Sequence, residues 1–249
     1  MLQRLFSSLT LLSVLFLLSS TSRAANVPTE VNLRIEGAET TIFEGPVVTR
    51  GHNVTTPSGG THKCDGTNNG ANPTAGPTCT SALDTGAKAH GFTFDGHVFP
   101  LPTMITDSTS CCHRTFNTEF DDFFITSIGG ESQTATQFWG ILLNYQFTPV
   151  GGCQQEVKLN DEILFAFDAF NKVHFLKLTG PHIAYVGHPV VLTVTDGQSG
   201  SPVAGAKVDG QTSDANGHVS LTFAKIGLQK VKAQKSDSVR SSQFDIEVL

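Results

Sequence analysis

The sequence has few basic residues for its length. Its 249 residues include 16 Lys and Arg against 22 Asp and Glu, a formal net charge of −6. A nucleic-acid-binding protein needs a basic surface to displace counterions from phosphates, and electrostatic attraction to anionic membranes needs one too. The composition therefore disfavours both kinds of partner.

Long apolar runs are missing after the first two dozen residues. The opening stretch "MLQRLFSSLTLLSVLFLLSSTSRA" places Arg4 before an apolar core, and Ser22 and Ala24 are the small residues that signal peptidase requires. We expect residues 1–24 to be a signal peptide. The mature chain would then be secreted, without a transmembrane segment, and would have 14 basic and 22 acidic residues, a net charge of −8. The ending "SSQFDIEVL" lacks the hydrophobic tail of a GPI signal, and association with a cell surface stays open.

Motifs of catalysis are also missing. No G-x-S-x-G elbow occurs, and no glycine-rich phosphate loop of the G-x-G-x-x-G or Walker type. Glu119, Asp121 and Asp122 form an acidic run, which we interpret as the solvated edge of a strand. A glycosidase needs two carboxylates across a cleft, a spacing that sequence does not show. We expect no enzyme, with a secreted carbohydrate hydrolase using these carboxylates as the alternative.

Charge and cysteine divide the mature chain into two parts. Residues 25–179 carry 8 basic and 16 acidic residues and all five Cys, whereas residues 180–249 carry six of each charge. Gly180-Pro181 is a suitable junction because Pro cannot continue a strand ladder. We expect one domain over residues 25–179 and a second over residues 180–249.

The first part has the pattern of a mixed α and β domain. "EVNLRIEG" alternates apolar and polar residues, as a half-buried strand does, and "TIFEGPVVT" is a second strand in which Gly45-Pro46 predicts a bulge or turn. "PTCTSALDTGAKAHGF" predicts a helix that Thr78 caps and Gly91 ends. The second part alternates throughout, with turn residues every ~8–12 positions, which predicts a small β-sandwich.

The cysteines favour disulfide bonds over zinc. No closely spaced C-x₂₋₄-C pair occurs among His62, Cys64, Cys79 and the Cys111-Cys112-His113 run, and an exported chain meets oxidising conditions. Five Cys allow two disulfides and leave one thiol.

Four stretches of the first part carry a family resemblance. "VNLRIEG…TIFEG", "HKCDGTNNGANPTAGPT", "FWGILLNYQFTPVGGCQQEV" and "NDEILFAF" resemble the uncharacterised secreted domains related to the C-terminal domain of transcobalamin, over about residues 30–178. The stretch "PVVLTVTDGQSGSPVAGAKVDGQTSDANGHVSLTF" is similar to Ig-like modules of bacterial and fungal surface proteins. The fold class expected is an α+β β-grasp-like domain, with one main helix across its sheet, followed by a small all-β Ig-like sandwich.

The resemblance also implies a disulfide between Cys64 and Cys153. The second bond would then join Cys79 to Cys111 or Cys112. Transcobalamin holds a corrinoid between such a domain and a large helical barrel, and no barrel is predicted here, so corrinoid binding is not expected to carry over.

The loop "GGTHKCDGTNNGANPTAGPTC" is the richest in polar side chains. Asp65, Thr67, Asn69 and Gly70 match positions 1, 3, 5 and 6 of an EF-hand loop, but Gly76 stands where the bidentate Glu belongs. We therefore expect no cofactor, with calcium as the alternative. Asp65, Asn68 and Asn69 remain candidates for contacting a ligand.

An aromatic pair supplies a second candidate. Trp139 and Tyr145 lie an even number of residues apart in a predicted strand, so both side chains should border one surface. This surface is either a platform for a sugar or plain core beneath the helix. Asn53 begins an Asn-Val-Thr glycosylation sequon. The sequence as a whole predicts a secreted, disulfide-stapled, non-catalytic binding or adhesion protein for an extracellular ligand or surface partner that it does not identify.

Overall fold

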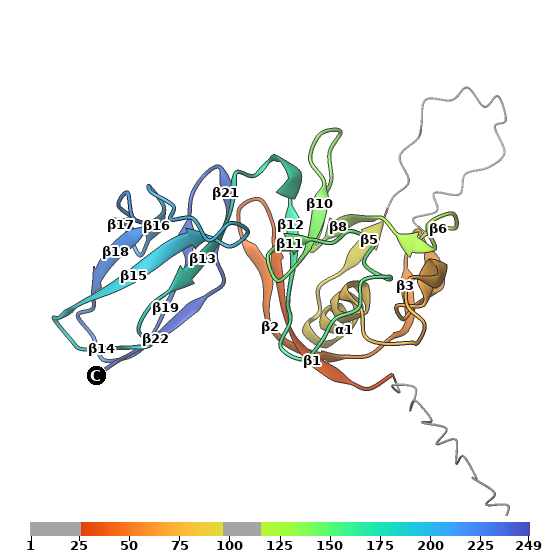
Figure 1. Cartoon of the computed structure of the whole chain (residues 1–249), viewed down its shortest axis with the longest axis horizontal. Helices are drawn as coiled ribbons and strands as arrows, with labels where there is room; N and C mark the ends of the chain where they lie inside the picture. Colours follow the sequence, from red (N-terminus) through yellow and green to blue (C-terminus); the bar gives the residue numbers. More distant parts are fainter. Residues whose placement is uncertain (1–25, 97–115) are drawn as a thin grey trace, which may run out of the picture.

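The computed structural model describes residues 26–96 and 116–249. These residues form 22 strands and one α-helix, and the strands make seven sheets (Figure 1). No helix in these two ranges is long and apolar enough to cross a membrane. The expected signal peptide, residues 1–24, lies outside them.

The largest sheet has five strands in the order β11-β10-β12-β1-β2. β1 pairs antiparallel with β2 and parallel with β12, which brings distant parts of the sequence side by side. The strands of this sheet are β1 Thr29–Glu36, β2 Thr41–Thr49, β10 Trp139–Leu143, β11 Gln146–Phe147 and β12 Glu162–Phe167.

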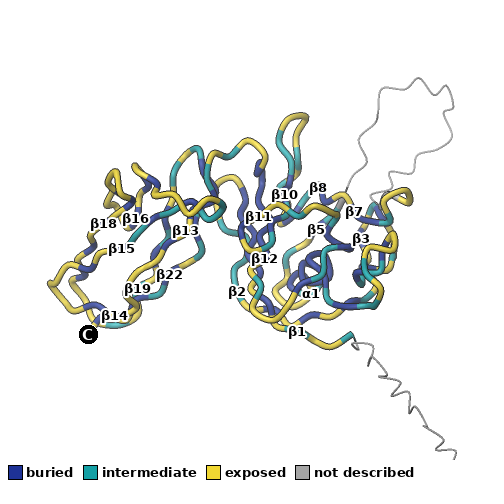
Figure 2. Tube along the Cα trace, in the orientation of Figure 1, coloured by how far each residue is buried: buried dark blue, intermediate teal, exposed yellow. Residues whose placement is uncertain are grey.

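The predicted helix is confirmed as α1, Cys79–His90. Thr78 caps its start by accepting a hydrogen bond from Ser81 N at 3.1 Å, and Gly91, with φ 77°, ends it. α1 packs on one face of the five-stranded sheet and is mostly buried (Figure 2). Gly86 permits close packing, because a Cβ there would lie 2.7 Å from Leu33 Cδ2.

The prediction of a bulge or turn at Gly45-Pro46 is wrong. The ladder between β1 and β2 runs through both residues, and its irregularity lies between Ile35 and Glu36 instead. β2 is the edge strand of the sheet, where a proline without an N–H is tolerated.

The C-terminal residues form three small sheets around a second hydrophobic core. The first has the order β18-β15-β13-β21, the second β14-β22-β19 and the third β17-β16-β20. The bounds are β13 His174–Thr179, β14 Ile183–Ala184, β15 Pro189–Asp196, β16 Lys207–Val208, β17 Gln211–Thr212, β18 His218–Thr222, β19 Gly227–Val231, β20 Ala233–Gln234, β21 Ser238–Val239 and β22 Phe244–Val248.

Three further small sheets complete the first part of the chain. They are the hairpin β3-β4, the pair β6-β7 and the three strands β5-β8-β9. Their bounds are β3 His52–Thr56, β4 Gly60–Cys64, β5 Phe94–Gly96, β6 Phe116–Asn117, β7 Asp122–Phe123, β8 Ile125–Ile128 and β9 Glu131–Ser132.

The expected fold class, a β-grasp-like α+β domain followed by an Ig-like sandwich, is wrong. The part of the chain that the structure describes is mostly β with a single α-helix, and its strands are divided among several small sheets. Frequent turn residues cut the alternating segments short; in "AKVDGQT", Asp209 and Gly210 leave strands of two residues on either side. An alternating pattern predicts strands but not how they are shared among sheets. The boundary between residues 179 and 180 stays a prediction; β13, just before it, pairs with β15, just after it.

Candidate functional site

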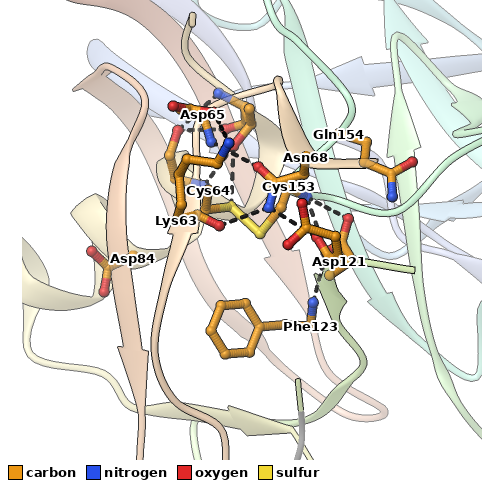
Figure 3. The surroundings of a disulfide bond; sticks show 12 residues. Lys63, Cys64, Asp65, Asn68, Asp84, Asp121, Phe123, Cys153 and Gln154 are labelled. Atoms are coloured by element: carbon orange, nitrogen blue, oxygen red, sulfur yellow. Dashed lines mark hydrogen bonds and ion pairs between the residues drawn. A yellow bond between two sulfur atoms is a disulfide. The ribbon is translucent and has the colours of Figure 1, made fainter. Parts of the chain in front are cut away.

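The polar loop is stapled by a disulfide between Cys64 and Cys153 (Figure 3). This is the pairing that the family resemblance implied, and the structure confirms it. Cys64 ends β4, Cys153 lies in the turn that follows β11, and both side chains are fully buried. The bond is compatible with an extracellular protein.

The side chains of the stapled loop bond to the loop itself and to the neighbouring residue Asp121. Asn68 is buried and donates through Nδ2 to Lys63 O at 2.7 Å and Asp121 O at 2.8 Å. Asp65 Oδ1 accepts from Thr67 N at 3.0 Å and Thr67 Oγ1 at 2.6 Å. These hydrogen bonds give Asp65 and Asn68 a structural role in the loop. Contact of either residue with a ligand remains a prediction.

Asn69 occupies the left-handed region, with φ 50°, and its backbone N–H donates to Asp121 Oδ2 at 2.8 Å. Within residues 26–96 and 116–249, no group of three or more His, Cys, Asp or Glu side chains is arranged to hold a metal ion. Calcium binding by Asp65 and Asn69 stays a prediction.

Asp122 is buried beside the disulfide. Its carboxylate accepts from Phe123 N at 2.7 Å and from Cys153 N at 3.0 Å. A Cβ on Gly151 would lie 2.2 Å from Asp122 Oδ2, so only glycine leaves room for this carboxyl. Burial raises the pKa of Asp122 to about 7 despite the backbone donors, which favour the charged form. The acidic run was interpreted as a solvated strand edge, and for Asp122 that interpretation is wrong.

Cys79, at the start of α1, is a buried thiol without a disulfide partner among the described residues. Burial raises its pKa, so the reactive thiolate is disfavoured. Its expected partners, Cys111 and Cys112, lie outside the described residues.

His52 is held between a carbonyl and a carboxylate. Its Nδ1 lies 2.7 Å from Arg50 O, and its Nε2 lies 2.6 Å from Asp84 Oδ2. The hydrogen bond to Asp84 raises the pKa of His52. Both ring nitrogens are used, so His52 fixes α1 to β3 and has no nitrogen left to act as a base.

Trp139 and Tyr145 do not share a surface. Trp139 faces the core beneath α1 and donates through Nε1 to Glu131 O at 3.2 Å. β10 ends at Leu143, and Asn144 and Tyr145 both have positive φ, 50° and 67°. This turn sends Tyr145 into a cluster on the opposite face of the sheet. The two residues are therefore not one platform.

That opposite face contacts the C-terminal part of the chain. The cluster that joins them contains Leu142, Tyr145, Leu164, Ala166, Ala169, Phe175 and Val239. An ionic group lies next to it: Glu36, 2% exposed, accepts from Lys232 Nζ at 2.7 Å and Arg240 Nε at 2.8 Å. We call this boundary the seam.

A pocket of about 240 Å³ lies at the seam. Arg34, which forms one of its walls, is only 6% exposed. Arg34 Nη1 donates to Arg240 O and lies 3.5 Å from Glu36 Oε1, and its guanidinium is 5.9 Å from the Tyr145 ring centroid. Nε and Nη2 of Arg34 make no hydrogen bond to the described residues. The remaining lining is Asn32, Leu33, Glu44, Gly45, Tyr145, Glu162, Ile163, Leu164, Ser242 and Gln243.

Sequence reasoning missed Arg34. The available signal was its place in "VNLRIEG", where Asn32 and Arg34 put polar side chains on one face of a strand whose other face is apolar. A half-buried strand implies that this face is solvated, whereas the C-terminal part of the chain covers it at Arg34 and Glu36.

A second, larger cleft of about 690 Å³ opens along the same seam. Its basic side chains are mostly paired: Lys172 with Asp168 at 3.5 Å, Lys235 with Asp237, and Arg240 with Glu36. Lys207 is its one cation without an ion pair to the described residues.

Asn53 lies on β3 with an exposed side chain, opposite Lys63 of β4. The position is accessible, and glycosylation there stays a prediction.

Comparison with protein families finds a match in the middle of the chain. A model of a domain of unknown function, DUF4430, matches residues 112–169. No curated protein matches the chain. The matched segment contains Asp122, Tyr145 and Cys153. The description of the family assigns no ligand or reaction to these residues. Neither comparison confirms the transcobalamin-like or Ig-like resemblance, and both stay predictions.

Proposed function

We propose that this is a secreted, non-catalytic protein that binds a small polar ligand in the pocket at the seam. The observation that carries the proposal is Arg34, whose side chain is only 7% exposed and lines the pocket, while its Nε and Nη2 have no partner among the described residues. These two nitrogens are free to donate into the pocket, and a ligand there would supply acceptors for a charged donor group that the rest of the side chain holds in place.

The two sites expected from sequence support this proposal less well. Trp139 is buried in the core. Asp65 accepts hydrogen bonds from Thr67, and Asn68 donates to Lys63 O and Asp121 O. The larger cleft is also a weaker candidate for a ligand site, because its cations other than Lys207 already have carboxylate partners. Tyr145, one of the residues singled out from sequence, does line the pocket.

A thermal-shift screen tests the proposal. The panel contains neutral sugars, sugar acids and amino acids, and the proteins are the wild type, Asn32→Trp and Gln211→Trp. Asn32 lines the pocket, and Gln211 is an exposed strand residue elsewhere, so the second variant controls for the added indole. A ligand raises the melting temperature of whichever protein binds it. We expect at least one compound to shift the wild type and Gln211→Trp but not Asn32→Trp.

A panel without any shift, or shifts that persist in Asn32→Trp, would contradict the proposal. The screen is repeated with 1 mM Ca²⁺, since a shift by Ca²⁺ alone would revive the metal interpretation of the Asp65 loop.

The alternative is a hydrolase that acts on carbohydrate. The observation in its favour is the pKa of Asp122, about 7, because a general acid must keep its proton near neutral pH. Incubation with a polysaccharide panel, followed by assay of reducing ends, tests it. Hydrolysis that disappears in Asp122→Asn or Glu119→Gln would replace the binding proposal, and binding without turnover supports it.

A further inference from the structure

The charges at the seam do not balance. Arg34, Lys232 and Arg240 surround Glu36, and Lys232 also bonds Glu44 Oε2 at 2.8 Å. Three cations therefore share two carboxylates, and the cluster carries one net positive charge. A buried positive charge is stabilised by an added anion, because the low dielectric strengthens their attraction.

The free atoms of Arg34 are suited to one kind of anion. Nη1 is already used by Arg240 O and Glu36, which leaves Nε and Nη2. These two nitrogens lie on the same edge of the guanidinium plane, and their N–H bonds run parallel. A carboxylate presents two oxygens at the matching separation and accepts both bonds at once.

The opposite side of the pocket offers an acceptor. Glu162, at the start of β12, lines the pocket, is exposed, and makes no side-chain hydrogen bond or ion pair to the described residues. A carboxylate in this position accepts bonds from hydroxyl or ammonium groups of a ligand. The amides of Asn32 and Gln243 add groups that both donate and accept.

Volume limits the size of the ligand. Pockets that enclose drug-sized molecules measure about 300–1,000 Å³. At about 240 Å³, this pocket takes a molecule of one sugar ring or less.

From these observations we infer that the ligand is a small carboxylate flanked by hydrogen-bond donors, bound by Nε and Nη2 of Arg34 through its carboxylate and by Glu162 through its donors. The inference rests on the proposed function, since it names the chemistry of the same pocket. Two sources share this chemistry, sugar acids with their hydroxyls and α-amino acids with their ammonium group.

Titration calorimetry with D-glucuronate, D-glucose and L-serine tests the inference and separates the two sources. Glucuronate and glucose differ at the carboxylate alone, so their comparison on the wild-type protein needs no variant. We expect glucuronate or serine to bind at least 10-fold more tightly than glucose, and Asn32→Trp to abolish the binding while Gln211→Trp retains it. Arg34→Lys, which keeps the charge and loses the paired donors, should weaken binding at least 10-fold. Its melting temperature reports whether it still folds.

If glucose bound as tightly as glucuronate, the inference that the ligand is a carboxylate would be overturned, while the proposal that the pocket binds a ligand would stand. The same holds if glucuronate and serine fail to bind while a neutral sugar of the panel binds and is blocked by Asn32→Trp. If nothing on the panel binds in the pocket, the proposed function fails together with the inference.

Discussion

Glu36 and Arg240 are 204 residues apart in the sequence, yet Arg240 Nε donates to Glu36 Oε2 at 2.8 Å. Arg240 Nη2 lies at the same distance, and Arg240 also donates to Gly37 O at 2.7 Å. This buried contact fixes the C-terminal part of the chain against the first sheet, on the face that α1 leaves uncovered.

Removal of the charge at Glu36 should weaken the contact between the first sheet and the C-terminal part of the chain. Glu36→Gln leaves Arg34, Lys232 and Arg240 without their shared carboxylate, and breaking a buried ion pair costs about 3–5 kcal/mol. We expect the free energy of unfolding in urea to fall by that amount. Glu39→Gln, an exposed position nearby, is the control and should change it by less than about 0.5 kcal/mol. Equal stability of the two variants would mean that the cluster does not hold the seam.

The disulfide closes a long loop. Cys64 and Cys153 are 89 residues apart, and a cross-link of that span restricts the unfolded chain by about 4–5 kcal/mol in the chain-entropy model. The double variant Cys64→Ala/Cys153→Ala should lose most of this stability in urea unfolding. Reductant should lower the midpoint of the wild type by more than that of the double variant, in which only the expected bond of Cys79 could still be reduced. A wild type that is indifferent to reductant would contradict the pairing.

Asp122 should make stability depend on pH. Its pKa in the folded protein, about 7, lies above the ordinary value of 3.8, so the folded state binds the proton more tightly. The resulting contribution to the free energy of unfolding is present in full below pH 4 and is lost as the pH rises through 7. Asp122→Asn keeps an oxygen acceptor for Cys153 N and never ionises.

Between pH 5 and pH 8, the free energy of unfolding of the wild type should therefore fall by about 2–3 kcal/mol more than that of the variant. Urea unfolding at the two pH values measures this difference. Asp209→Asn, at an exposed turn position with φ 46°, is the matched control and should follow the wild type. A variant that loses as much stability as the wild type between these pH values would exclude Asp122 as the source.

Gly86→Ala should destabilise the protein although it improves helix propensity. In an open helix this change adds about 1 kcal/mol of stability. Here the new Cβ would lie 2.7 Å from Leu33 Cδ2, and Leu33 is fully buried. Overpacking costs about 1–3 kcal/mol, so we expect a net loss in thermal or urea unfolding. A more stable variant would show that Leu33 or α1 shifts enough to make room for the added methyl group.

Local features of the fold were predictable from the sequence. Both ends of α1 were predictable because the capping residues, Thr78 and Gly91, directly flank the helix. β1 follows its alternating pattern in the same way. The sheets were not predictable, because the pairing of β1 with β12 depends on residues far apart, and short turns distribute the other strands among several sheets.

The candidate site was predictable in part. The Cys64–Cys153 pair came from a family resemblance, and Tyr145 came from strand periodicity, although the turn that moves it to the other face has no clear signal, since positive φ at a Tyr is uncommon. Arg34 was missed because its environment is made by residues 240–243. A buried arginine looks in sequence like any other polar residue of a half-exposed strand.

The position of β1 also sets an order of events for the growing chain. β1 is made among the first strands, but its parallel neighbour β12 and the ion partners Lys232 and Arg240 follow much later. Until then, one edge of β1 lacks its neighbour, and the charge of Glu36 stays in water. Contacts of such long sequence separation slow folding. The earliest strand is thus secured by some of the last residues to be made, and loss of the C-terminal segment would expose the N-terminal sheet rather than leave it as an independent unit.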